Sequence, residues 1–150
     1  FKGVQRRFSH LFDYNNISFY DDYAHHPTEI SSVLSGVEKV YKNKEIVCVF
    51  QPHRISRVIS LKKEFSKCFK KADIVLLCPI YAANEKLRLN FTYHSFAKLI
   101  IKNSNVRLIQ VENELQLQKF IKQNVFGEKI YIGMGAGSIS NWMKNLKNIF

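Results

Sequence analysis

A regular alternation of short apolar runs with amphipathic stretches, from residue 17 to the end of the chain, most constrains the fold. Runs such as 45–50 (EIVCVF) and 73–78 (DIVLLC) are almost continuously apolar, which is typical of parallel strands covered on both faces. Between such runs the apolar residues recur at helical spacing, as in Ile30, Val33, Leu34, Val37 and Val40. This order predicts an α/β fold, in which a mostly parallel sheet has helices on both faces.

The apolar runs define about six strands. We expect them at residues 8–12, 17–22, 45–50, 73–78, 106–111 and 129–133. Residues 13–16 (DYNN) read as a turn, so the first two strands should form an antiparallel hairpin. Helices are expected from Pro27, after the strand 45–50, at 92–102, at about 113–124 and at the C-terminal end. Pro27 suits a first helical position, and the last helix has a core-facing stripe of Ile139, Trp142, Met143, Leu146 and Ile149.

Length and composition narrow the class of protein. A chain of 150 residues that is 46% hydrophobic suits one globular domain and excludes a disordered segment. No apolar run approaches the roughly 20 residues that span a bilayer. The start lacks both an initiator Met and an apolar signal, so we expect an excised domain of a longer protein. Three widely spaced cysteines in apolar segments predict reduced core thiols in a cytoplasmic protein.

The net charge of +11 raises the alternative of a nucleic-acid-binding module. The lysines are scattered over polar helix faces, however, which favours a solvated surface over a binding stripe. The arginines are grouped differently: four of the six lie in two pairs, Arg6–Arg7 and Arg54/Arg57. Guanidinium groups suit the capture of carboxylate or phosphate, so these pairs are candidate binding residues.

Four polar stretches follow four of the expected strands. They are Asp21–Asp22 and the ranges 51–54, 81–85 and 133–138. Because ligands of open α/β sheets bind outside the carboxyl ends of the strands, all four stretches should meet at one edge of the sheet. The sequence therefore predicts a ligand site at this edge.

Each polar stretch also has a structural interpretation. His25 and His26 point in different directions in most backbones, so a helix cap plus a packed ring is favoured over a metal site. Arg54 and Arg57 would share a helix face, and form an anion pocket with the helix end, if a helix begins near residue 54. The glycine-rich stretch 133–138 lacks the features of a dinucleotide fingerprint, and close packing of strand and helix is expected there. A dehydrogenase-type cofactor domain is disfavoured for the same reason, and His10 and His94 are expected to be structural.

The motifs FKGVQRRF, DDYAHHPTEI, FQPHRISR, YAANE and GAGSI occur in this order and together resemble the C-terminal domain of the Mur ligases, over essentially all 150 residues. The resemblance implies a Rossmann-like domain, residues 1–150, of a three-domain enzyme whose UDP-sugar domain and central ATP domain are absent from this chain. These ligases phosphorylate a carboxylate with ATP and Mg²⁺, and an amine then attacks the acyl phosphate. The member that the chain most resembles adds L-alanine to UDP-N-acetylmuramate in peptidoglycan synthesis. The closest alternative is the murein-peptide ligase of cell-wall recycling.

The resemblance also implies roles for individual residues. Arg7 and Asp22 match ATP contacts, and the amino-acid site would be formed by His25, His53, Arg54 and Arg57. Tyr81 and Glu85 would contribute from a loop, and no residue matches a metal ligand. The isolated domain is expected to be inactive. The protein is expected in the cytoplasm, and neither a membrane nor a specific nucleic acid is expected as a partner. Ala24 stands where the family commonly has glycine, which is a mild change. Asn84 replaces the glycine usual before Glu85, and the proline often found shortly afterwards is absent. This weakens the transfer to the loop 81–86, although asparagine can adopt the left-handed conformation that the turn needs.

Overall fold

The computed structural model describes residues 7–86 and 92–150, which form a six-stranded sheet with the order β1-β2-β6-β3-β4-β5. The strands are β1 (Ser9–Tyr14), β2 (Ile17–Asp22), β3 (Glu45–Phe50), β4 (Ile74–Leu77), β5 (Arg107–Gln110) and β6 (Lys129–Met134). The helices are α1 (Pro27–Val40), α2 (Ile55–Ser60), α3 (Lys62–Lys67), α4 (Tyr93–Ser104), α5 (Glu114–Gln123) and α6 (Ile139–Asn145), followed by the 3-10 turn η2 (Leu146–Ile149). The α/β prediction is confirmed, although Arg6 and part of the loop 79–91 lie outside the described residues.

The hairpin at the start of the sheet is also confirmed, with a correction to its turn. β1 pairs antiparallel with β2, and every other neighbouring pair of strands is parallel. β1 continues to Tyr14, so the turn is shorter than predicted and consists of Asn15 and Asn16. Both residues have a positive φ, 52° and 66°, and asparagine tolerates this conformation in two-residue hairpin turns.

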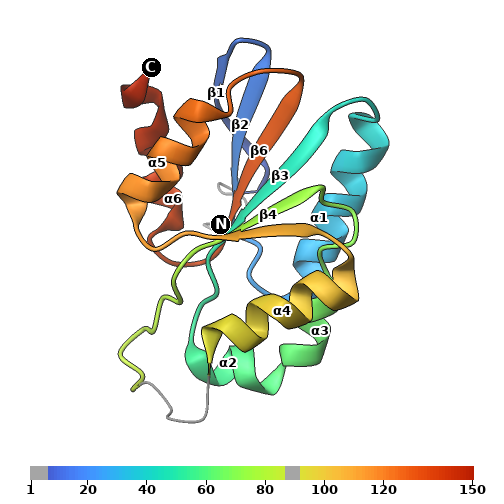
Figure 1. Ribbon diagram of the computed structural model, residues 1–150, viewed down its shortest axis with the longest axis vertical. Helices are drawn as coiled ribbons and strands as arrows, with labels where there is room; N and C mark the ends of the chain where they lie inside the picture. The colour runs from blue at the N-terminus through green and yellow to red at the C-terminus, as the bar shows by residue number, and fades with distance from the viewer. Residues whose placement is uncertain (1–6, 87–91) are drawn as a thin grey trace.

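The chain reverses its direction across the sheet at β6. From β2 it steps outward through β3, β4 and β5, and it then returns to insert β6 between β2 and β3. Helices α1 to α4 cover one face, whereas α5 and α6 cover the other, as Figure 1 shows. The segments that leave β6 and β3 therefore depart to opposite faces, and such a switch point is where open α/β sheets bind ligands.

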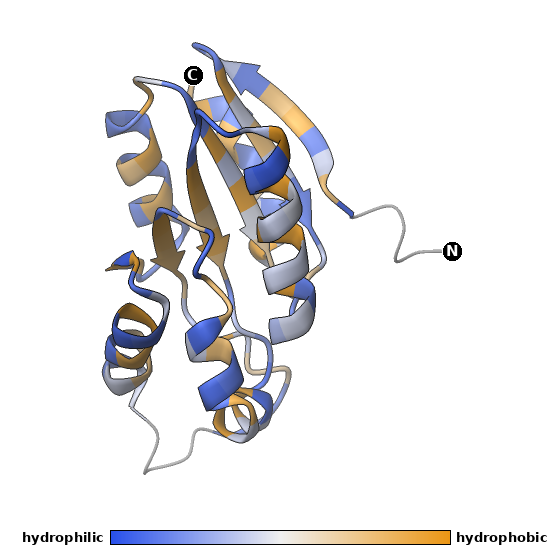
Figure 2. Cartoon of the chain, turned by 90° about the vertical axis from the view of Figure 1, so that its right-hand side faces the viewer, coloured by the Kyte–Doolittle hydropathy of each residue, from blue (hydrophilic) through white to orange (hydrophobic). Residues whose placement is uncertain are grey.

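Each face of the sheet has its own hydrophobic core. One core packs Leu34, Phe65 and Phe96 against the sheet, and the other packs Leu117 and Met143. Figure 2 shows the hydrophobic strands enclosed between the two layers of helices. The predicted C-terminal stripe belongs to the second core: Ile139, Met143 and Leu146 are buried, and Trp142 and Ile149 pack against it partly buried.

The helix expected after β3 is interrupted. Leu61 has φ −112° and ψ 22°, which ends α2 and separates it from α3. The apolar spacing continues through Leu61, so the hydrophobic period gives no signal of the break. Phe65, Cys68 and Phe69 are nevertheless buried. Within the described residues, no helix has the length and apolar character needed to cross a membrane.

Candidate functional site

The carboxyl ends of β2, β6, β3 and β4 lie side by side, as the sequence predicts. Asp22 and Phe50 are both registered against Met134 of β6, and Phe50 is also registered against Leu77 of β4. The polar stretches that follow these strands are thereby brought to one edge of the sheet. Two neighbouring regions form there, and a ring contact between Tyr23 of the first and His25 of the second joins them.

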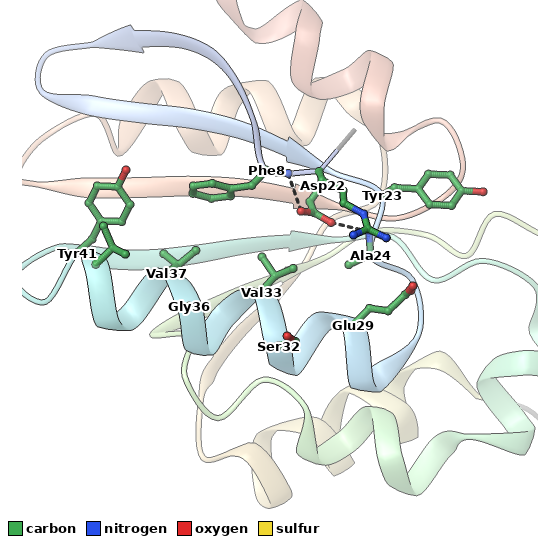
Figure 3. Close-up of a pocket in the computed structure, with 12 residues that line it drawn as sticks. Phe8, Asp22, Tyr23, Ala24, Glu29, Ser32, Val33, Gly36, Val37 and Tyr41 are labelled. Atoms are coloured by element: carbon green, nitrogen blue, oxygen red, sulfur yellow. Dashed lines mark hydrogen bonds between the residues drawn. The ribbon is translucent and has the colours of Figure 1, made fainter. Parts of the chain in front are cut away.

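The first region, which we call the α1 groove, has a volume of about 700 Å³. In Figure 3 it extends along α1 from Glu29 to Tyr41, with the ring of Phe8 on the opposite side. Gly36 contributes to the opening, because a methyl group at this position would meet no atom within 4 Å. The residues that line the groove are Arg7, Phe8, Asp22, Tyr23, Ala24, Glu29, Ser32, Val33, Gly36, Val37, Val40 and Tyr41.

Asp22 joins β2 to the segment that precedes β1. One carboxylate oxygen accepts a hydrogen bond from the backbone N–H of Phe8 at 2.7 Å, and the other accepts from that of Ala24 at 2.8 Å (Figure 3). Asp22 is buried, with only 4% of the residue exposed. Burial raises the pKa of Asp22, and the two backbone donors offset this only in part. Asp22 therefore fixes the backbone next to Arg7, in addition to lining the groove.

The adjacent histidines have separate roles. His26 is the N-cap of α1: its Nδ1 accepts from the N–H of Thr28 at 3.3 Å, and Glu29 accepts in return from the N–H of His26 at 3.1 Å. Partial burial opposes the ionisation of Glu29, but the amides of His25 and His26 hold its pKa below the usual value. The predicted cap is confirmed, and Pro27 occupies the first helical turn.

The second region, the histidine–arginine cluster, consists of His25, His53, Arg54, Arg57 and Tyr81. The ring of His53 stacks on Tyr81 with centroids 5.4 Å apart and lies 6.3 Å from the ring of His25. Nη1 of Arg57 lies 3.4 Å from Nδ1 of His53. Burial, followed by the positive charge of Arg57 and the neighbouring His25 and Arg54, lowers the pKa of His53. The imidazole is therefore neutral at pH 7.

Arg54 has an unusual backbone conformation, with φ 70° and ψ 126°. Its N–H donates to the carbonyl oxygen of Tyr81 at 2.8 Å, and the N–H of Tyr81 donates to Pro52 at 2.8 Å. A non-glycine residue outside the favoured regions costs about 1–3 kcal/mol and is often found at functional sites. The surrounding hydrogen bonds thus hold Arg54 in a conformation that it would not adopt alone.

The two arginines lie together at the start of a helix, as predicted. α2 begins at Ile55, so Arg54 is its N-cap and Arg57 lies in its first turn. Both side chains line one shallow pocket, together with Ser56, Ser60 and Leu61. The pairing was predictable from sequence, but the backbone turn that achieves it was not.

The N-terminal end of α2 is occupied by Glu85 and is not a vacant anion site. The Glu85 carboxylate accepts from the backbone N–H of Ser56 at 3.1 Å and from its hydroxyl at 2.5 Å. These hydrogen bonds, the hydroxyl first, lower the pKa of Glu85. Asn84 has φ 71° and Ala83 has φ 52°, so the turn is retained without glycine, as proposed for Asn84. Glu85 thus fixes α2, and its contact with a substrate remains a prediction.

The glycine-rich turn 135–138 packs against the cluster. Gln51, a residue that the sequence did not single out, accepts from the N–H of Ile139 and donates to the hydroxyl of Ser138, both at 3.0 Å. A methyl group on Gly137 would lie 2.6 Å from Cγ of Tyr81. The predicted close packing of this turn is therefore confirmed. The only sequence signal that could have identified Gln51 is its position directly after the buried strand β3.

The chain matches known proteins along most of its length. Residues 6–135 match the family model described as Mur ligase, glutamate ligase domain. A UDP-N-acetylmuramate–L-alanine ligase of Pelagibacter ubique is 62% identical over 149 residues, which are 99% of this chain and 32% of that protein. A protein of the same name from Brachyspira hyodysenteriae is 42% identical and aligns with 93% of this chain and 30% of its own length. The chain thus spans about a third of the length of these curated relatives.

Solved structures have the same fold. The crystal structure of a UDP-N-acetylmuramate–alanine ligase from Thermotoga maritima matches 95% of this chain and 29% of its own, with a TM-score of 0.69 and 28% identity. A murein peptide ligase from Psychrobacter arcticus matches 97% of this chain and 30% of its own, with a TM-score of 0.76. At 18% identity, the second match is evidence for the fold alone.

Proposed function

The chain belongs to the Mur ligase family, and from this membership we propose that it is the C-terminal, amino-acid-binding domain of a UDP-N-acetylmuramate–L-alanine ligase. The proposal assigns residues 1–150 to one domain that closes over the nucleotide and assigns the UDP-sugar and ATP domains to the remainder of the enzyme. The 62% identity to a ligase of this name supports L-alanine as the amino acid. ATP, L-alanine and UDP-N-acetylmuramate would then be the substrates, and we propose a cytoplasmic location because ATP is the energy source.

The observation that most supports this function is the histidine–arginine cluster. Arg54 and Arg57 line one shallow pocket beside His53, at the carboxyl edge of the sheet. A guanidinium group pairs well with a carboxylate, so the pocket suits the α-carboxylate of a small amino acid. The ring of His25 lies beside that of His53, with centroids 6.3 Å apart, and would contact the same bound amino acid.

We propose that the α1 groove lies next to the nucleotide. Arg7 is an exposed cation that lines the groove together with Asp22, and a cation there would neutralise phosphate charge. Asp22 already accepts two backbone hydrogen bonds. A contact from Asp22 to the nucleotide would therefore use the remaining lone pairs of its carboxylate, while Asp22 also fixes the backbone beside Arg7.

The reaction needs no covalent enzyme intermediate. ATP transfers a phosphoryl group to the muramyl carboxylate, and the amine of alanine then attacks the acyl carbon and displaces phosphate. This domain would bind and orient the amine, exclude water from the acyl phosphate, and neutralise charge. Within residues 7–86 and 92–150 no three His, Cys, Asp or Glu side chains are grouped as an all-protein metal site requires.

An assay of the complete enzyme tests this function. With ATP, Mg²⁺ and UDP-N-acetylmuramate, we expect ADP release that depends on L-alanine, and much less release with an L-alanyl peptide. The 150-residue chain alone should release no ADP. A complete enzyme that uses the peptide and ignores alanine would instead support a murein-peptide ligase.

A further inference from the structure

The hydrogen-bond partners of the His25 and His53 rings define which ring nitrogen of each neutral imidazole bears the proton. Nδ1 of His25 lies 3.0 Å from the carbonyl oxygen of Tyr23, which can only accept, so this nitrogen donates. The carboxylate of Glu29, 3.7 Å from the same nitrogen, favours the same arrangement. In the neutral ring, Nε2 of His25 is therefore an acceptor with a lone pair.

His53 has the opposite arrangement. Its Nδ1 lies 3.4 Å from Nη1 of Arg57, and a guanidinium nitrogen can only donate. Nδ1 of the neutral His53 ring is therefore the acceptor, and its Nε2 bears the proton. The lowered pKa of His53, caused by burial and by the charges of Arg57, His25 and Arg54, agrees with a neutral ring.

The two rings thus differ in what they offer to a ligand that contacts both. A zwitterionic amino acid has an ammonium group that donates and a carboxylate that accepts. Nε2 of His25 suits the ammonium group, and the N–H of His53 suits the carboxylate beside the two arginines. We propose that His25 is the catalytic proton acceptor for the incoming amino group, and that His53 is held by Arg57 as a neutral donor to the carboxylate. This inference rests on the proposed ligase function.

The proton transfer has a defined place in the reaction. The ammonium group gives one proton to Nε2 of His25, which frees the nitrogen lone pair. The lone pair attacks the acyl carbon and forms the C–N bond, while the C–O bond to phosphate breaks and phosphate leaves with its electron pair. A second proton leaves the nitrogen with the phosphate, which yields the amide N–H.

Kinetics of the complete enzyme test the role of His25. His25→Gln retains a side-chain acceptor but cannot take up a proton. We expect kcat to fall by about 100-fold or more, which is typical of a lost general base, while the KM for alanine changes little. The decline of kcat at acid pH should also disappear. The groups that face His25 are Tyr23, Glu29 and His53, and Arg57 contacts Nδ1 of His53. The decline of kcat would therefore report on the protonation of His25 among these neighbours. The exposed His94→Gln is the matched control and should behave as wild type.

A kcat within about threefold of wild type, or a higher KM as the main effect, would overturn the proton-acceptor role. Nitrogen-15 NMR of histidine-labelled complete enzyme tests the tautomers without any turnover. We expect protonated Nδ1 in His25 and protonated Nε2 in His53, and the reverse in either ring would overturn the inference. If the wild-type enzyme released no ADP in response to alanine, the proposed function would fail, whereas a reversed tautomer in an active enzyme would defeat only the present proposal.

Discussion

At the scale of single residues, the site depends on polar groups whose partners are already in place. Asp22 accepts from two backbone amides, and Arg57 fixes the orientation of His53. The sequence identified these residues as candidate binding residues from their chemical type and from their position after a strand. It could not reveal that Asp22 has a structural role as well, because its Phe8 partner is 14 positions away.

Asp22→Asn tests this structural role. The substitution retains the shape of the side chain but replaces one accepting oxygen with an NH₂ group, so either Phe8 or Ala24 loses its acceptor. We expect the free energy of unfolding to fall by about 1–3 kcal/mol in urea titrations. Asp13→Asn alters an exposed carboxylate and should change the free energy of unfolding by less than about 0.5 kcal/mol. Equal effects of the two substitutions would contradict the role of Asp22.

The lowered pKa of His53 predicts that stability depends on pH. Because the folded-state pKa of His53 lies below 6.5, the unfolded chain takes up its proton at a higher pH than the folded chain does. The free energy of unfolding should therefore fall as the pH decreases from about 6.5 towards the folded-state pKa. His53→Gln should reduce this fall, as measured by urea unfolding at several pH values. An unchanged pH dependence in His53→Gln would show that the ring is not perturbed as described.

At the scale of elements, the sequence predicted which strands and helices exist better than how they end. The helix beginning at Pro27 and the capping role of His26 follow from local chemistry, and both are confirmed. The break at Leu61 and the turn at Arg54 are not visible in the hydrophobic period. The turn at Arg54 depends on a tertiary hydrogen bond from its N–H to the carbonyl oxygen of Tyr81, and Glu85 holds the neighbouring Ser56. The histidine–arginine cluster is thus shaped by contacts between segments that are distant in sequence.

Two glycine-to-alanine substitutions separate packing from helix propensity. A methyl group on Gly137 would overlap Tyr81, so Gly137→Ala should lower the free energy of unfolding by about 1–3 kcal/mol. Gly36 lies inside α1 with open space around it, so Gly36→Ala should raise stability by up to about 1 kcal/mol. Urea titrations of both variants give the comparison. A neutral Gly137→Ala would mean that the turn 135–138 does not constrain Tyr81.

At the scale of the whole molecule, strand order determines which residues meet. The alternation in the sequence indicated a parallel sheet, and the rule for carboxyl ends then predicted the edge that holds the site. Placing β6 between β2 and β3 was beyond sequence reasoning, because any order of similar apolar strands satisfies the same pattern. This order brings Gln51 and the turn 135–138 together, and it explains why the role of Gln51 was missed.

The two cores also protect the cysteines. Cys48, Cys68 and Cys78 are buried, and burial raises the pKa of Cys48 well above its usual value and that of Cys78 to about 12. A thiol reagent such as a maleimide should therefore label the native chain very slowly, because the thiolate is the reactive form. In urea all three thiols should react at once. Rapid labelling of the native chain would contradict the described packing.

We propose that the histidine–arginine cluster binds the amino acid of a ligase reaction. The most direct measurement of this role is the steady-state kinetics of Arg54→Ala in the complete enzyme, with alanine and ATP varied separately. Loss of a charged hydrogen bond should raise the KM for alanine about 10-fold or more and leave the KM for ATP unchanged. Arg107→Ala, at the opposite end of the strands, is the control and should match wild type. An unchanged KM for alanine in Arg54→Ala would show that Arg54 does not bind the amino acid.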